Sequence, residues 1–99
     1  MRNLFIALLF SFYSYGQQYT VVQINARWNI SNDVKLNLPS NVKYKYAYLE
    51  EQKESMRKNL KAVPVIVLYK NERPIKQWNA DITFKLNIKE EEILNYVQN

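Results

Sequence analysis

Residues 62–78 read AVPVIVLYKNERPIKQW, and this stretch decides the architecture that the sequence predicts. The run VIVLYK is almost wholly apolar and is typical of a strand that is covered on both faces. Residues 70–73 are polar and predict a tight turn, after which residues 74–78 return as a partner strand. Because a connection this short joins only antiparallel neighbours, the stretch predicts a β-hairpin.

The segments before and after the hairpin predict further strands and short helices. Residues 19–26 (YTVVQINA) are rich in β-branched side chains, and residues 42–49 (VKYKYAYL) alternate lysine with tyrosine, which favours a strand but leaves its buried face open. Residues 51–60 and 87–97 predict helices, the second with an asparagine cap. Residues 29–40 predict either a short helix or an extended arm.

Connections of about a dozen residues permit parallel pairing of the first strands, so the sequence predicts an α/β fold with one mixed sheet and flanking helices.

The composition excludes several classes of chemistry. A chain of 99 residues allows one domain, and it contains no cysteine, no histidine and one glycine, Gly16. Zinc sites, histidine bases, thiol nucleophiles and glycine-rich phosphate loops are therefore not expected. The carboxylate cluster at residues 90–92 lies in the first turn of a predicted helix, where the helix dipole favours it. We expect no enzyme activity, no metal and no cofactor.

Residues 1–16 predict a secretory signal peptide. A charged start, an apolar run and a small-x-small site formed by Ser14 and Gly16 are its signature. The apolar run is shorter than the about 20 residues that span a bilayer. We therefore expect a domain over residues 17–99 in a periplasmic or secreted protein. The alternative is a retained N-terminal strand or helix that packs on the domain. An uncleaved N-terminus would also be the protein's one contact with a membrane.

Three segments together resemble the thioredoxin family. Residues 21–29 (VVQINARWN) look like its first core strand running into the active-site loop, and residues 62–78 look like its proline strand and hairpin. Residues 88–97 (IKEEEILNYV) look like its closing helix. The resemblance covers roughly residues 19–97 and implies a thioredoxin-like mixed sheet of four strands with flanking helices.

The sequence departs from that family in the loop ARWNISND, residues 26–33. Asn29 and Asn32 stand where the family carries its two active-site cysteines, and an amide neither attacks nor forms a disulfide. Gln23 stands at the position of a buried aspartate, which is consistent either with lost redox chemistry or with a satisfied core amide. The interval from Asn29 to Pro64 is shorter than in the family, which predicts a shortened first helix. The resemblance thus implies a redox-inactive member.

The same resemblance implies a binding edge. Pro64 would be cis and lie beside the active-site loop, and Val63 would offer unpaired backbone groups to an extended peptide. An ordinary trans proline at the start of a strand is the alternative. Trp28 is either an exposed recognition aromatic or a core residue. The candidate binding residues are Trp28, Asn29, Asn32, Val63 and Pro64.

Two further interpretations concern the partner. The tyrosine–lysine alternation and the net charge of +5 are features of proteins that bind nucleic acid. The positive charge is spread along the chain, however, and the predicted export separates the protein from nucleic acid, so a solvated lysine face over a tyrosine-rich strand is favoured.

The leading hypothesis is an exported, redox-inactive thioredoxin-like module that binds or scaffolds a protein or peptide. The sequence names neither this partner nor the oligomeric state. The alternative is a small structural subunit of an envelope or virion assembly that an uncleaved apolar N-terminus tethers.

Overall fold

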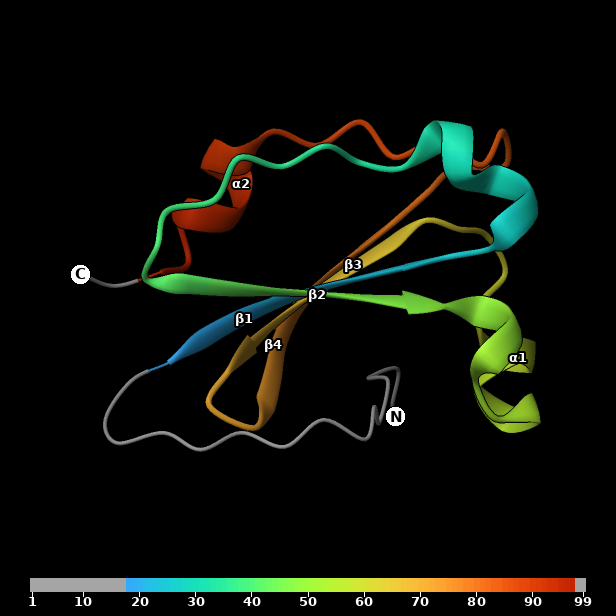
Figure 1. Ribbon diagram of the computed structural model, residues 1–99, viewed down its shortest axis with the longest axis horizontal. Helices are drawn as coiled ribbons and strands as arrows, with labels where there is room; N and C mark the ends of the chain where they lie inside the picture. The colour runs from blue at the N-terminus through green and yellow to red at the C-terminus, as the bar shows by residue number, and fades with distance from the viewer. Residues whose placement is uncertain (1–17, 98–99) are drawn as a thin grey trace.

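A computed structural model describes residues 18–97 of the chain, and the predicted signal peptide, residues 1–16, lies outside the described residues. Four strands form one mixed sheet in the order β2-β1-β3-β4 (Figure 1). The strands are β1 (Tyr19–Asn25), β2 (Val42–Tyr48), β3 (Val65–Lys70) and β4 (Arg73–Asn79). β1 pairs with β2 in parallel, whereas β3 is antiparallel to both β1 and β4. The predicted α/β class, mixed sheet and hairpin are therefore confirmed.

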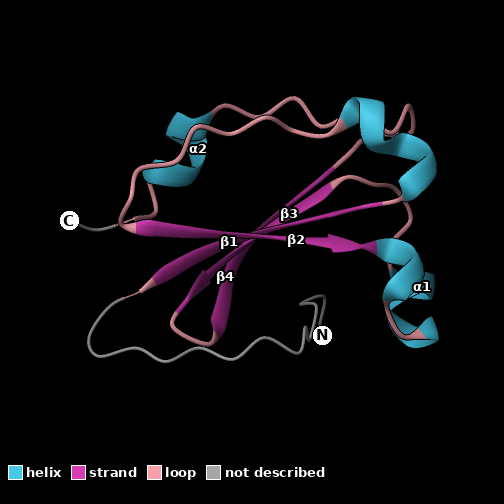
Figure 2. Ribbon diagram, viewed as in Figure 1, coloured by secondary structure: helices cyan, strands magenta, loops and turns pink. Residues whose placement is uncertain are grey.

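The helical segments are short. They are the 3-10 turns η1 (Arg27–Asn32) and η2 (Leu49–Glu51) and the α-helices α1 (Glu54–Asn59) and α2 (Glu90–Leu94). η1 and α1 lie at the end of the sheet where β1 and β2 finish, and α2 lies at the opposite end (Figure 2). None of the helices within residues 18–97 has the length and apolar character needed to cross a membrane.

The final helix is shorter than the sequence predicts, and the predicted asparagine cap is wrong. The backbone N–H of Lys89 donates to the Glu92 carboxylate, and the N–H of Glu92 donates to the Lys89 carbonyl. This reciprocal pair makes Lys89, two positions after Asn87, the cap of the helix, because a glutamate three residues on is available to Lys89 as well.

The core lies on both faces of β3, which is why this strand has no polar alternation. Val65, Val67 and Tyr69 face one side, where side chains from η2 and α1 pack against them. Ile66 and Leu68 face the other side, where Ile93 of α2 packs together with Trp78. Residues 33–38 form an extended arm over this second face, to which Val34, Leu36 and Leu38 contribute. Of the segment 29–40, for which a short helix and an extended arm were the alternatives, the first four residues belong to the 3-10 helix η1 and residues 33–39 are the extended arm.

Candidate functional site

The topology brings three loops to one end of the sheet. β1 ends there at Asn25, and because β3 is antiparallel to β1, β3 begins at the same end with Val65. β4 is antiparallel to β3, so its last residue, Asn79, also lies there. The loop after β1, the segment before β3 and the turn after β4 are thus neighbours in space although they are far apart in sequence.

Asn29 joins these three loops. It is 3% exposed, and its side-chain Nδ2 lies 3.1 Å from the carbonyl oxygen of Val63 and 3.1 Å from that of Phe84. The same nitrogen lies 3.0 Å from Oδ1 of Asn25, while Oδ1 of Asn29 accepts from Nδ2 of Asn32 at 2.8 Å. An amide has two N–H groups, so three acceptors share them. The Asn29 side chain is therefore a buried hydrogen-bond hub, which links the three loops.

Asn25 extends this network to the edge of the sheet. Its Nδ2 donates to the backbone oxygen of Asn29 at 2.9 Å and to the Asp33 carboxylate at 2.7 Å. The Tyr46 hydroxyl donates to the same carboxylate oxygen at 2.7 Å. Burial, and then the hydrogen bond to Asp33, raise the pKa of Tyr46 above its ordinary value. The loop is thereby fixed at both of its ends.

Gln23 holds the arm that follows the loop. Its side-chain Oε1 accepts from the N–H of Val34 at 2.7 Å, and its Nε2 donates to the Val34 carbonyl at 3.0 Å. Nε2 also donates to the Tyr44 hydroxyl at 2.8 Å. Burial raises the pKa of Tyr44. Gln23 is a satisfied core amide, which is one of the two interpretations that the sequence allowed.

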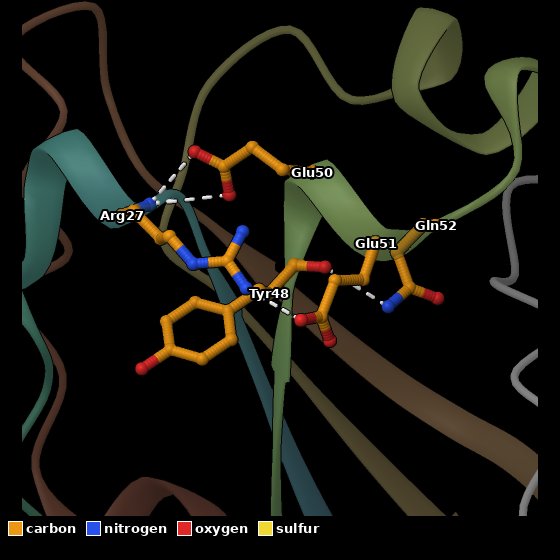
Figure 3. A network of polar contacts seen from close by, with 5 residues as sticks. All are labelled: Arg27, Tyr48, Glu50, Glu51 and Gln52. Carbon is orange, nitrogen blue, oxygen red and sulfur yellow. Dashed lines mark hydrogen bonds and ion pairs between the residues drawn. The ribbon is translucent and has the colours of Figure 1, made fainter.

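Arg27 ties the start of η1 to the end of β2 (Figure 3). Its backbone N–H donates to the Glu50 carboxylate, with a shortest distance of 2.9 Å, and its guanidinium pairs with Glu51. The guanidinium carbon also lies 4.3 Å from the ring centroid of Tyr48. Because this ion pair is half-exposed, we expect it to contribute at most about 1 kcal/mol. Sequence reasoning did not identify this cluster, since it depends on the meeting of two loops.

Trp28 is exposed beside the buried hub. Its side chain is 64% exposed, and its ring meets that of Phe84 edge to face, with centroids 5.0 Å apart. Of the two interpretations of Trp28, an exposed aromatic or a core residue, the structure shows an exposed aromatic. Ile82, in the same turn as Phe84, is 91% exposed. This end of the sheet thus presents aromatic and aliphatic side chains to solvent.

The turn that carries Phe84 is held tightly. The N–H of Phe84 donates to the carbonyl of Asp81 at 3.0 Å, and Thr83 donates to the Asp81 carboxylate through both its hydroxyl and its backbone N–H. These hydrogen bonds from Thr83 hold the pKa of Asp81 below its ordinary value. Phe84 has a left-handed backbone with φ of 63°, an uncommon conformation for a bulky residue. Strained residues of this kind cluster at functional sites.

The structure brings together the residues that the sequence singled out, with one difference. Asn29 contacts both Asn32 and Val63, Trp28 is its neighbour in the chain, and the Val63–Pro64 peptide bond is cis. The expectation that Val63 offers unpaired backbone groups is wrong for its carbonyl, which accepts from Asn29. Pro64 is buried, and its carbonyl accepts from the N–H of Ala80 at 3.1 Å.

The site that remains accessible is therefore the Trp28–Phe84 pair on the solvent side of the hub. Sequence reasoning missed Phe84, because nothing in the run DITFK marks a left-handed phenylalanine. The residues that the structure describes contain no group of acidic, histidine or cysteine side chains placed to hold a metal ion. Comparison with protein-family models gives no match, and comparison with curated proteins gives none either.

Proposed function

We propose that this protein is an exported, redox-inactive thioredoxin-like module that binds a segment of another protein at the Trp28–Phe84 pair. Two observations support the thioredoxin-like part of the proposal. The sheet is mixed and has four strands, and Asn29 lies against Val63, beside Pro64, as the resemblance implies for the active-site loop.

The redox-inactive part rests on the chemistry of the side chains in the loop. The sequence contains no cysteine, so it has no thiol to exchange with a disulfide. Asn29 and Asn32 instead hydrogen-bond to each other, and Asn29 also binds the carbonyls of two other loops. These amides act as structural links within the protein.

The binding part rests on one observation: a largely exposed tryptophan that is held on a fixed support. Trp28 follows directly in the chain from Arg27, which is paired with Glu51, and directly precedes the buried Asn29. Its ring is further fixed by the edge-to-face contact with Phe84. An aromatic residue that is ordered before binding loses little entropy on binding, and tryptophan is the residue most enriched among interface hot spots.

An insulin reduction assay tests the redox part. We expect the full-length protein to give the background rate of insulin precipitation with dithiothreitol, because no side chain in the chain forms a mixed disulfide. A rate that rises with protein concentration would contradict this part of the proposal and leave the binding part standing.

An array of extended peptides tests the binding part. We expect a set of peptides that binds the wild-type protein and loses binding at least about tenfold with Trp28→Ala, since hot-spot tryptophans contribute about 2 kcal/mol or more. Tyr96→Ala is the matched control, because Tyr96 is also an exposed aromatic and contacts Trp78 on the opposite face. If no peptide depends on Trp28 more than on Tyr96, the proposed site is wrong.

Mass spectrometry of the protein recovered from the producing cells tests the export part. We expect a chain that begins at Gln17, as the small-x-small site predicts. Recovery of an intact Met1 would favour the tethered structural subunit instead.

A further inference from the structure

The two outer strands of the sheet differ in how they could accept another strand. β4 carries Pro74, and its register with β3 shifts between Leu68 and Tyr69. Proline and bulges are devices that blunt the edge of a sheet. β2 contains no proline, and it has no bulge because all seven of its residues keep an unbroken register with β1. Within residues 18–97, no strand pairs with the outer edge of β2.

The side chains of β2 divide by charge between the two faces of the sheet. Lys43 pairs with Thr20 and Lys45 with Val22, so both lysines lie on the face that α1 covers at one end. Tyr44 and Tyr46 lie on the other face, and Tyr44 is 45% exposed. An added strand would therefore meet positive charge on one face and tyrosine rings on the other.

We propose that the outer edge of β2 binds an extended, acidic segment of another protein as a fifth strand. Backbone hydrogen bonds would extend the ladder, acidic side chains at alternate positions would lie opposite Lys43, and apolar side chains between them would pack on Tyr44. This surface is separate from the Trp28–Phe84 pair, so the inference does not depend on the function proposed above.

Charge complementarity favours an acidic strand over a second copy of the chain at the outer edge of β2. Antiparallel pairing of two β2 edges about a twofold axis perpendicular to the sheet places the lysines of both copies on the same face, and in the registers that set them directly opposite one another the like charges are destabilising. The lysines of β2 thus prevent self-pairing, which is a recognised role of lysine on edge strands. The charge of the exposed Lys43 attracts a strand that carries glutamate or aspartate.

Fluorescence anisotropy with a labelled seven-residue peptide of alternating glutamate and valine tests the proposal on the full-length protein. We expect saturable binding that Lys43→Glu weakens by roughly three- to tenfold and that added salt weakens as well. Arg73→Glu is the matched control, because it makes the same change of charge on an exposed residue of the other outer strand. It should change the affinity by less than about twofold.

Two modified peptides and one protein variant distinguish strand addition from other modes of binding. N-methylation of alternate backbone amides should abolish binding, because it removes the hydrogen bonds of an added strand, and scrambling the peptide should weaken binding. Trp28→Ala should leave binding unchanged. Three results would overturn the proposal: no binding of the unmodified peptide, binding of the methylated peptide as tight as that of the unmodified one, or loss of binding with Trp28→Ala. So would a wild-type dimer in sedimentation velocity that the peptide dissociates, since a second copy would then occupy the edge.

Discussion

The central strand β3 and the neighbouring loop η1 are both buried in part, but different interactions hold them. Ile66 and Leu68 of β3 are 0% exposed and are surrounded by apolar side chains. Asn29 of η1 is buried to a similar degree, yet its contacts are hydrogen bonds to carbonyl oxygens on three segments. Apolar burial has no direction, whereas an amide must find each partner at the correct distance and angle. The side chains of the strand are therefore held by the apolar area that they bury, whereas the loop depends on individual donor–acceptor contacts.

Truncation of the central strand should have the largest effect. We expect Leu68→Ala to lower the free energy of unfolding by about 2–5 kcal/mol, because a fully buried leucine leaves a cavity as well as losing its transfer energy. Urea denaturation followed by circular dichroism measures the change. Ile82→Ala, at a residue that is 91% exposed, should change it by less than about 0.5 kcal/mol. Equal effects of the two substitutions would contradict the assignment of β3 to the core.

Removal of the hub amide should come second. Asn29→Ala leaves the carbonyls of Val63 and Phe84 without their donor, and we expect a loss of about 1–3 kcal/mol in the free energy of unfolding. Asn32→Ala removes a single partly buried hydrogen bond and should cost about 1 kcal/mol or less. If Asn29→Ala is no more destabilising than Asn32→Ala, the hub does not support the loop.

A pair of substitutions at Phe84 separates its ring from its backbone. Both Phe84→Ala and Phe84→Gly remove the contact with Trp28, but only glycine has no Cβ to disfavour a φ of 63°. We therefore expect the glycine variant to be more stable than the alanine variant by about 1 kcal/mol in urea denaturation. The reverse order would show that the left-handed backbone costs nothing here.

The ionisation of Tyr46 should have the smallest effect on stability at neutral pH, because the group loses its proton only in alkaline solution. The pKa of Tyr46 is raised in the folded protein from the ordinary value of 10.0, so above about pH 10 the unfolded chain loses this proton first. Stability should thus be unaffected by this group below about pH 10 and should fall as the pH rises above that value toward the raised pKa of the folded state. The free energy of unfolding of Tyr46→Phe should fall less steeply with pH than that of the wild type. The control variant Ile82→Ala should show the same slope as the wild type. An unchanged slope in Tyr46→Phe would contradict this linkage.

The fold could be predicted from the sequence where apolar pattern and turn length decide it. The run VIVLYK and the short polar turn after it are sufficient to predict β3 and β4, because local pattern and loop length restrict the pairing to a hairpin. The boundaries of α2 could not be predicted as well, since two cap positions compete before the glutamates at residues 90–92.

The candidate site could be predicted only in part. The positions of Asn29, Val63 and Pro64 followed from the resemblance, but the role of Asn29 did not. Its acceptors lie 34 and 55 positions away in the chain, and no local pattern encodes a hydrogen bond over that separation. The exposure of Trp28 was undecided for the same reason, because its support comes from Phe84.

The burial of Asn29 also has a consequence for how the protein can be produced. Asn29, Ile30 and Ser31 form the Asn-x-Ser acceptor sequence of N-linked glycosylation. A sugar on Nδ2 would replace one of the two N–H groups that bind the carbonyls of Val63 and Phe84, and a side chain that is 3% exposed leaves no room for it. A chain glycosylated during synthesis would therefore be unable to close this loop, whereas a chain made in a host without that pathway folds with its acceptor asparagine already enclosed.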